Sequence, residues 1–409
     1  MKKVTDIMGI NQLLLDEIRK RGKKGNPLIE HLGTTKQLPH FDQLMFLPNQ
    51  LHEFMLMDDI EVNTKTLIGP KANKPLEIST PMMITAMTYG VVSKEAKLAL
   101  AKASTLAGIS ANSGEGGMHL EERELANKYV LQYNRGGFSN DEAHLKLADM
   151  IEIKWGQGAN PGTYSILPAS QMENELPIIR NLQPGQDSYM PPHHPSINNH
   201  QDLKNTVDYL KEVSGGVPIS IKFCASRIKE DIDIALYAGA DVIVIDGAQG
   251  GTGGSLILTE NDYGVPTIYA ASIAGDYLKM KDVKDKISLI IAGGIRTPGD
   301  IMKAIALGAD AIYACTIFML AMTLPQNEDS AYLKDPLQLV HYNVPENKLF
   351  NIDRGAESLA NYIRACTEEM KMGCKLLGID DIHKLDKTML YSLDEQIGKV
   401  AGIKKLWEI

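Results

Sequence analysis

Two glycine-rich segments in the second half of the chain have the composition of backbone cradles for a phosphate group. GGIRTPGD (293–300) follows an apolar run and leads into a helical pattern, and DGAQGGTGGS (246–255) follows another apolar run. Glycine lets the backbone approach a phosphate, and backbone N–H groups at a helix start favour its charge. Glycine also serves plain tight turns and flexible lids. Together the two segments predict one phosphorylated cofactor held from two sides.

Three charged residues could act on that cofactor or on a substrate. Lys222 lies in the apolar run ISIKF, where a buried ammonium is costly unless it meets an anionic ligand or a structural acid. Glu115 stands among glycines in SANSGEGG, as a general base, a gate or a solvated loop acid. Arg180 suits bidentate binding of a substrate carboxylate, although a surface arginine is the alternative. We take Glu115 and Lys222 as catalytic candidates and Arg180 as a substrate-binding candidate.

The scaffold for these residues is indicated by eight short apolar runs that alternate with helical periodicity. Several runs are apolar throughout, as expected of strands buried on both faces. The alternation favours an α/β fold, a (β/α)8 TIM barrel with N-terminal and C-terminal extensions, over an open doubly wound sheet. In a barrel the loops that follow the strands build the active site. The eight runs are 82–87, 109–113, 129–133, 151–155, 217–223, 242–247, 287–294 and 311–315.

Capping residues and long connections mark the boundaries between these elements. Ser93 is predicted to cap the helix that follows it, which Gly108 ends, and Thr297 with Pro298 begins another helix. The connections at about 156–201 and 248–267 are long, and long loops in compact domains are often functional. Both follow predicted strands, so we expect them to contribute to the site.

The length and composition set the domain division and the classes of partner. The 409 residues suffice for one barrel of about 250 residues with additions. We expect an extension packed on the barrel at 1–80, the barrel at 81–325 and a C-terminal helical extension at 326–409. The net charge of −9 disfavours nucleic acid, and no two of the four cysteines have C-x-x-C spacing, so no metal site is expected. We see no signal peptide and no apolar run of about 18 residues, and we expect a cytoplasmic protein without membrane contact.

A set of ordered motifs resembles the FMN-binding synthase domain of glutamate synthase, and its short stand-alone members most of all. The resemblance covers about residues 40–400 and implies a (β/α)8 barrel with non-covalent FMN. It implies an FMN-dependent oxidoreductase in which reduced flavin delivers hydride from N5 to a small anionic substrate, with reduction of 2-iminoglutarate to glutamate as the leading case. The motifs are AMTYGVVSKEAKLALA, SANSGEGG, IKWGQGANPG, PPHHPSINNHQDL, SIKF, GGTGGS and AGGIRTPGDI.

The same motifs assign individual residues to FMN and to the substrate. Backbone groups would face the flavin ring after the first strand, polar side chains would meet its edges, and glycines would hold its phosphate. The implied FMN-binding residues are Ala86, Met87, Thr88, Gln157, Lys222, Gly251, Gly253, Gly293, Gly294, Arg296, Ala314 and Cys315. The implied substrate-binding residues are Glu115, Asn160, Tyr164 and Arg180.

Departures from the family pattern bear on the substrate and on the electron donor. Asn160 stands where the family has a lysine that helps to bind the oxo acid, and Tyr164 adds bulk nearby. A dehydrogenase, oxidase or isomerase acting on another substrate therefore remains an alternative, as does a non-catalytic flavin-binding subunit. The stretch IFMLAMTLPQNEDS lacks the iron–sulfur cysteines of long members, and the chain begins MKKV, without an amidotransferase cysteine. We expect electrons from a ferredoxin-like or NAD(P)H-dependent donor.

Overall fold

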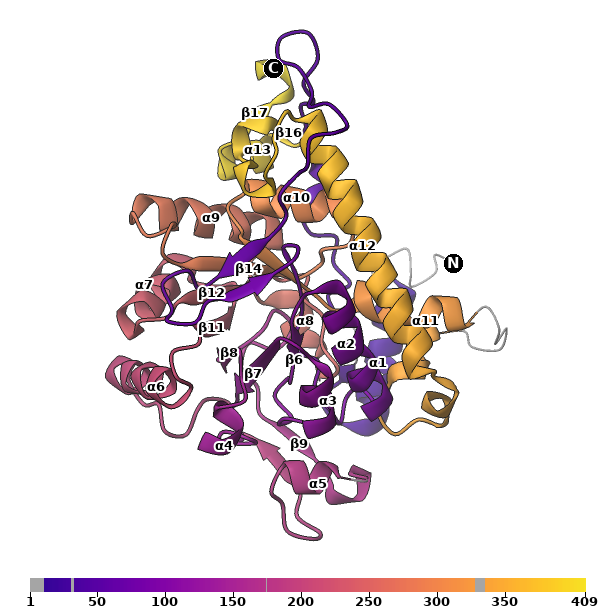
Figure 1. The fold of residues 1–409 in the computed structure, drawn as a ribbon. Helices are drawn as coiled ribbons and strands as arrows, with labels where there is room; N and C mark the ends of the chain where they lie inside the picture. The colour runs from indigo at the N-terminus through magenta and orange to yellow at the C-terminus, as the bar shows by residue number, and fades with distance from the viewer. Residues whose placement is uncertain (1–10, 31–32, 174, 328–334) are drawn as a thin grey trace, which may run out of the picture.

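Eight parallel strands form one barrel sheet in the computed structural model, which describes residues 11–30, 33–173, 175–327 and 335–409 (Figure 1). Along the sheet the order is β5-β15-β14-β12-β11-β8-β7-β6. Each predicted apolar run overlaps one strand, so the predicted (β/α)8 barrel is confirmed. The strands are β5 (Met82–Ile84), β6 (Ala111–Asn112), β7 (Tyr129–Tyr133), β8 (Met150–Lys154), β11 (Ile219–Cys224), β12 (Val242–Asp246), β14 (Ser288–Ala292) and β15 (Ala311–Ala314).

The barrel closes at a seam between β5 and β6. These two strands are the ends of the paired ladder, and no register pairs them directly among the described residues. The backbone N–H of Ile84 donates to the carbonyl oxygen of Ser110 across the seam, at 3.2 Å. Additional contacts must therefore hold the two strand ends together.

A helix follows each strand and covers the outside of the barrel (Figure 1). The predicted caps are present, since the side chain of Ser93 accepts from the N–H of Ala96 and that of Thr297 from Asp300. Gly108 ends its helix in the left-handed conformation, with φ of 69°. The helices are α2 (Lys94–Ala107), α3 (Leu120–Leu125), α4 (Glu142–Leu145), α6 (His200–Val213), α7 (Ile228–Ala238), α9 (Thr267–Met280), α10 (Pro298–Ala306) and α11 (Thr316–Asn327).

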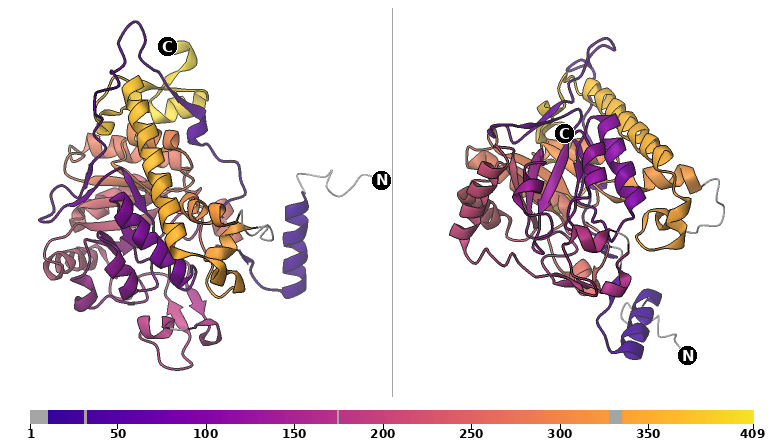
Figure 2. Two further views of the ribbon diagram at one scale, coloured as in Figure 1. Left: turned by 45° about the vertical axis from the view of Figure 1, so that its right-hand side comes forward. Right: turned by 60° about the horizontal axis from the view of Figure 1, so that its bottom comes forward.

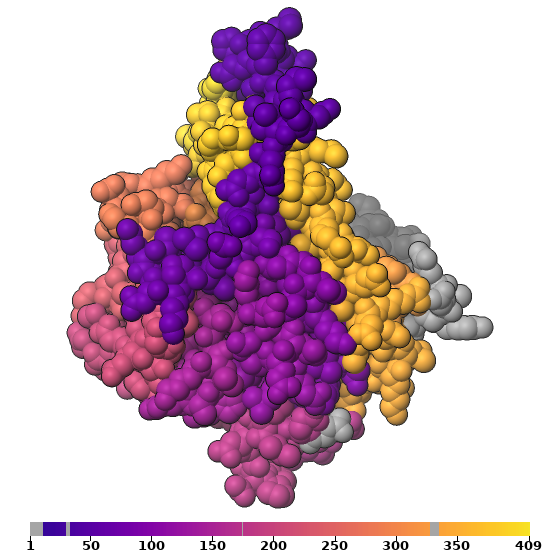
Figure 3. All heavy atoms as spheres, viewed as in Figure 1, coloured from indigo at the N-terminus to yellow at the C-terminus, as the bar shows by residue number. Residues whose placement is uncertain are grey.

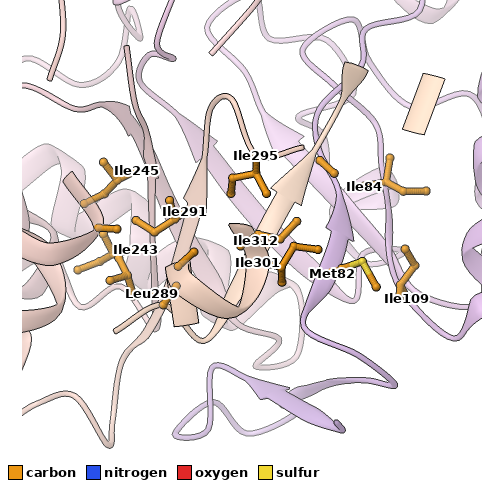
Figure 4. Packing of buried hydrophobic residues seen from close by; sticks show 14 of the residues in the cluster. Met82, Ile84, Ile109, Ile243, Ile245, Leu289, Ile291, Ile295, Ile301 and Ile312 are labelled. Atoms are coloured by element: carbon orange, nitrogen blue, oxygen red, sulfur yellow. The ribbon is translucent and has the colours of Figure 1, made fainter. Parts of the chain in front are cut away.

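Strand side chains pack alternately against the helices and into the barrel. Ile243, Leu289, Ile291 and Ile312 are fully buried and lie near Ile301 of α10 (Figure 4). A second buried cluster fills the interior with the alternate strand residues and with the hairpin of β3 (Thr66–Ile68) and β4 (Leu76–Ile78). The backbone N–H of Gly69 in that hairpin donates to Ser288 at the start of β14, so the hairpin closes the amino-terminal end of the barrel. The carboxyl-terminal end remains for the site.

The segments outside the barrel differ in how closely they pack on it. Helix α1 (Gln12–Lys24) buries no residue and stands off the barrel (Figure 2), whereas β1 (Ile29–Glu30) pairs with β13 (Ser255–Leu256). Helix α12 (Ile352–Leu376) packs against α2, α10 and α11, and the loop 50–60 lies beside its carboxyl-terminal end and the C-terminal elements (Figure 3). The division at residues 80 and 325 remains a proposal.

The remaining strands are β2 (Leu44–Phe46), β9 (Ser165–Leu167), β10 (Ser188–Met190), β16 (Leu390–Ser392) and β17 (Lys404–Lys405). The remaining helices are α5 (Leu176–Ile179), α8 (Ile257–Asp262) and α13 (Glu395–Ala401), with short 3-10 turns η2 (Phe41–Gln43), η3 (Ala169–Gln171), η4 (Pro336–Val340), η5 (Pro345–Leu349), η6 (Ile382–Lys384), η7 (Lys387–Met389) and η8 (Leu406–Glu408). None of the described helices has the length and apolar character that a membrane crossing requires.

Candidate active site

The loops at the carboxyl-terminal ends of the strands carry most of the predicted site residues. Because all eight strands are parallel, their carboxyl ends open on the same mouth of the barrel. The structure thus brings together positions that lie up to about 230 residues apart in the sequence. They are Ala86, Met87 and Thr88 after β5, Glu115 after β6, Gln157 after β8, Lys222 in β11, Gly251 and Gly253 after β12, Gly293, Gly294 and Arg296 after β14, and Ala314 with Cys315 at the end of β15.

The turn after β14 has the geometry of a phosphate cradle. Gly293 and Gly294 have φ of 105° and 69°, and a Cβ on Gly294 would lie 2.6 Å from Cβ of Gln249. The backbone N–H groups of Gly294 and Ile295 donate to no acceptor in the part of the chain that the structure describes. An anionic oxygen would satisfy such donors. The cradle therefore fits the phosphate of FMN.

An N-terminal segment, residues 33–43, braces this cradle from outside. The imidazole Nε2–H of His40 donates to the carbonyl of Gly294 at 2.6 Å. Gln249 donates to the carbonyl of Pro39 at 2.8 Å and accepts from the N–H of Thr267, also at 2.8 Å. The loops after β12 and β14 are thereby tied to one another and to the segment.

Arg296 and Cys315, two further residues predicted to bind FMN, differ in exposure and charge. The guanidinium of Arg296 is half exposed and pairs with Asp42 of the segment 33–43 at 2.6 Å. Burial raises the pKa of the Cys315 thiol to about 11, and Lys222 opposes that rise, so the group is a thiol at neutral pH. A Cβ on Gly253 would lie 2.0 Å from Cγ1 of Val91, so any larger residue would have to displace the Val91 side chain. FMN binding by Arg296, Cys315 and Gly253 remains a prediction.

Two buried lysines lie side by side at the mouth. Lys222 of β11 and Lys154 of β8 are register partners, and each is 2% exposed. Lys222 donates to Oγ1 of Thr85 at 3.3 Å, and its Nζ lies 5.2 Å from the ring centroid of Tyr313. Burial lowers the pKa of Lys154, Glu115 opposes that effect, and the net pKa lies below its usual value. Adjacent buried cations repel one another, so the pair favours nearby negative charge, part of which Glu115 supplies to Lys154.

Glu115 is held between two cations. Its carboxylate lies 2.7 Å from Nζ of Lys154 and 3.5 Å from the guanidinium of Arg135, and its backbone N–H donates to Oγ1 of Thr88. Burial raises the pKa of Glu115, but Lys154 and Arg135 outweigh burial and the net pKa lies below its usual value. The side chain is therefore a carboxylate at neutral pH, not a proton donor.

Arg135 and Lys154 are members of the site that the sequence analysis did not identify. Lys154 satisfies the criterion that singled out Lys222, a lysine near the end of an apolar strand, in the run IEIKW. Arg135 follows the strand Tyr129–Tyr133 by two residues, at the position where barrel enzymes place functional groups. A search for every charged residue at a strand end would have found both.

Arg180 is buried rather than superficial. It follows α5 in the long connection after β8, is 8% exposed, and donates to Oγ of Ser188 (2.9 Å) and to the carbonyl of Tyr89 (3.0 Å). Burial lowers its pKa to about 10, against the effect of Glu115, so it remains a cation at neutral pH. No carboxylate of the described residues forms an ion pair with it. A Cβ on Gly116 would lie 3.3 Å from its guanidinium, which places Arg180 beside the Glu115 loop.

Asn160 shapes its own loop. Its Oδ1 accepts from the backbone N–H groups of Gly162 (3.2 Å) and Thr163 (2.9 Å), and the side chain is 7% exposed. The backbones of Gln157 and Asn160 exchange two hydrogen bonds, at 2.9 and 3.1 Å. Tyr164 is 63% exposed. Direct roles of Asn160, Gln157 and Tyr164 in binding remain predictions.

His194 forms a hydrogen bond with the backbone of Lys154. Its Nε2–H donates to the carbonyl of Lys154 at 2.9 Å, and its ring stacks on Tyr133 with centroids 5.5 Å apart. Burial lowers the pKa of His194 to about 4, so the ring is neutral at physiological pH. This histidine is a packed structural residue.

Two buried guanidinium groups at the mouth keep a donor that no protein acceptor in the described parts of the chain meets. Arg135 and Arg180 each keep a buried Nε–H without an acceptor among the described residues. A buried donor without a hydrogen bond is costly in free energy. These two donors therefore indicate a ligand with several anionic oxygens. With the phosphate cradle, the arrangement can hold a phosphorylated cofactor and an anionic substrate next to each other.

Comparison with known proteins places this site in a family. Residues 23–380 match the model of the conserved region in glutamate synthase. A glutamate synthase large subunit-like protein of Rhizobium meliloti is 31% identical over 408 residues, covering 95% of this chain and 92% of its own length. An archaeal-type glutamate synthase (NADPH) of Thermotoga maritima is 33% identical over 357 residues, covering 86% of this chain and 70% of its own length.

Solved structures agree on the fold. A flavocytochrome b2 mutant with benzoylformate superposes with a TM-score of 0.57 at 16% identity, over 88% of this chain and 80% of that one. A mandelate oxidase mutant reaches a TM-score of 0.52 at 18% identity, over 84% of this chain and 86% of that one. The sequence matches span most of the chain and the barrel carries a fitting phosphate cradle, so the chain belongs to the glutamate synthase family of FMN-dependent oxidoreductases.

Proposed function

We propose that this protein reduces an imino acid to an amino acid, with 2-iminoglutarate and glutamate as the leading pair. The observation that carries the proposal is the unmet buried Nε–H on both Arg135 and Arg180, which each lie against the Glu115 loop. Arginine donors match carboxylates in a bidentate manner. A dicarboxylate supplies the acceptors that these side chains lack.

FMN, when bound, supplies two-electron chemistry, taking electrons from a donor and giving a hydride to the substrate. Gly293 and Gly294 would hold its phosphate, and the backbone of Ala86, Met87 and Thr88 would lie against its ring. Lys222 would meet an oxygen-rich edge of the ring and stabilise negative charge there.

The remaining residues act on the substrate. Arg180 would bind one of its carboxylates, and Arg135 would offer a second donor. Since Glu115 is ionised, its carboxylate would favour a protonated imine, which is the better hydride acceptor. The reaction balances as 2-oxoglutarate plus ammonia giving imine and water, then imine plus hydride and a proton giving glutamate.

The electrons require a partner. The Thermotoga maritima relative is named as an NADPH enzyme. We propose an NAD(P)H-dependent or ferredoxin-like donor for this chain as well.

A second candidate keeps the flavin and changes the substrate. Asn160 replaces the family lysine, its amide is neutral, and its Oδ1 is already used inside the loop. A dehydrogenase, oxidase or isomerase acting on an anion with fewer charges would fit this weaker positive field.

The test is an anaerobic experiment on the FMN-loaded protein. Photoreduced enzyme is mixed with 2-oxoglutarate and ammonium, and reoxidation of the flavin absorbance is followed together with the appearance of glutamate. Glutamate formed in step with reoxidation supports the proposal. Flavin that is reoxidised only by other oxo acids or imines would establish the second candidate, and flavin that no substrate or donor affects would point to a non-catalytic subunit.

A further inference from the structure

A buried lysine on α2 joins the two strand ends at the barrel seam. Lys97 is 1% exposed, and its Nζ donates to the carbonyl oxygens of Met87 (2.8 Å), Asn112 (2.7 Å) and Ser113 (3.1 Å). Met87 follows β5, whereas Asn112 and Ser113 lie at the end of β6. One ammonium therefore bridges the two strands that no ladder register pairs.

The contacts require Lys97 to be a charged donor. Carbonyl oxygens only accept hydrogen bonds, and the three carbonyls take up the three N–H groups of an ammonium. Glu122 supplies the opposite charge as an ion pair, with Oε1 2.7 Å from Nζ of Lys97 but no hydrogen bond to it, and its Oε2 accepts from the hydroxyl of Tyr129 at 3.0 Å. Both charged side chains are 1% exposed, so neither is compensated by water. The desolvation cost of such a buried pair offsets much of its attraction, so the pair is weak evidence of added stability.

The seam also fixes how the Glu115 loop rests on the segment after β5. A Cβ on Gly114 would lie 2.7 Å from the backbone nitrogen of Thr88, so the two backbones are in direct contact. The N–H of Glu115 donates to Oγ1 of Thr88. A displacement of Met87 relative to Ser113 would therefore shift the Glu115 carboxylate relative to the backbone predicted to face the flavin.

We propose that Lys97 is a positioning residue for the reaction. It fixes the flavin-facing backbone at Met87 against the loop that carries the substrate-side carboxylate Glu115, without touching either ligand. The inference rests on the proposed function, because it takes FMN to lie against residues 86–88. Lys97 and Glu122 act as one unit, so they must be changed together.

The experiment compares K97M/E122Q with wild type and with K102M. Methionine keeps the length of the lysine stem without its donors, and glutamine removes the orphan charge while keeping an acceptor for Tyr129. Lys102 lies on the same helix, and its more exposed side chain pairs with Asp353 at 2.6 Å, so K102M is a matched control outside the seam. The FMN dissociation constant is measured by fluorescence quenching, and the asymmetry of the bound flavin by visible circular dichroism.

We expect K97M/E122Q to remain folded, to bind FMN at least tenfold more weakly and to show a changed flavin dichroism spectrum. K102M should match wild type in both. A purely structural role would lower the melting temperature and leave the FMN constant and the flavin spectrum unchanged. That outcome, with an FMN dissociation constant within twofold of the wild-type value, would overturn the inference.

Failure of the double variant to fold and failure of the wild-type protein to bind FMN have different consequences. If K97M/E122Q does not fold, K97R decides by the same criteria, because a planar guanidinium keeps the charge but cannot place one nitrogen among three carbonyls. If K97R had an unchanged FMN dissociation constant and an unchanged flavin dichroism spectrum, the inference would be overturned. If wild-type protein itself binds no FMN, the failure belongs to the proposed function and not to Lys97.

Discussion

Replacing Arg180 by glutamine should remove most of the affinity for a dicarboxylate. Arg180 is 8% exposed and has no carboxylate partner among the described residues, so a bound carboxylate would be its only opposite charge in contact. Truncating one member of a buried, hydrogen-bonded charge pair costs about 2 to 5 kcal/mol. A value of about 3 kcal/mol corresponds to a loss of about 150-fold in the dissociation constant.

The assay is an anaerobic titration of the FMN-loaded protein with 2-oxoglutarate, followed by the perturbation of the flavin absorbance. R180K serves as the conservative variant, since it keeps the charge but loses the fork of donors, and we expect a loss of about tenfold for it. R364Q serves as the control, because Arg364 lies exposed on α12 and its hydrogen bonds among the described residues go to its own helix. It should leave the constant unchanged.

A structural role for Arg180 predicts a different pattern. Its hydrogen bonds to Ser188 and to the carbonyl of Tyr89 would then matter by themselves, so R180K and R180Q would weaken binding equally. Binding of 2-oxoglutarate to folded, FMN-loaded R180Q within threefold of wild type would refute the reasoning outright.

Three other expectations concern the cofactor and the stability of the barrel. Gly294→Ala should weaken FMN binding at least tenfold, because its φ is 69° and its Cβ would meet Gln249 at 2.6 Å. Gly402→Ala, at φ of 64° with open space around it, should leave FMN binding unchanged. Equilibrium dialysis measures the FMN dissociation constant of both variants. The pKa of His194 falls from 6.5 to about 4 on folding, so its contribution to stability is complete above pH 6.5 and is lost as the pH falls. Between pH 7 and 5 the free energy of unfolding, measured in urea, should fall by about 2 kcal/mol. This loss should disappear in His194→Gln. Lys222→Met should lower the midpoint potential of bound FMN by about 30 mV, equivalent to about 1.4 kcal/mol for two electrons, because the cation that we propose to lie near the reduced flavin is lost. An unchanged or higher potential in a dye-equilibration titration would contradict this proposed placement.

The barrel was predictable from local patterns. Each strand is a short apolar run, and the residues that begin and end helices carry local chemistry, as Ser93, Gly108 and Thr297 show. These signals depend on near neighbours in the sequence, and the alternation of strand and helix then leaves few topologies.

The partnerships within the site were less predictable. Glu115 was identified, but its cations Arg135 and Lys154 were not, because their meeting depends on the register of β6, β7 and β8 around the barrel. Asn160 was identified as a departure from the family, yet its use inside the loop depends on a backbone turn that its residue type alone does not specify. Lys97 gave no signal, since a lysine on a helix is ordinarily solvated.

The brace that His40 forms with Gly294 has a consequence for the order of events during synthesis. The two residues are 254 positions apart, and closure of such a long loop is slow to form and contributes late. At a ribosomal rate of about 5 to 20 residues per second, His40 emerges roughly 13 to 50 s before its partner exists. The nascent barrel must therefore complete seven of its strands with this end undocked, and capture of free FMN should become possible only after about three quarters of the 409 residues have been made.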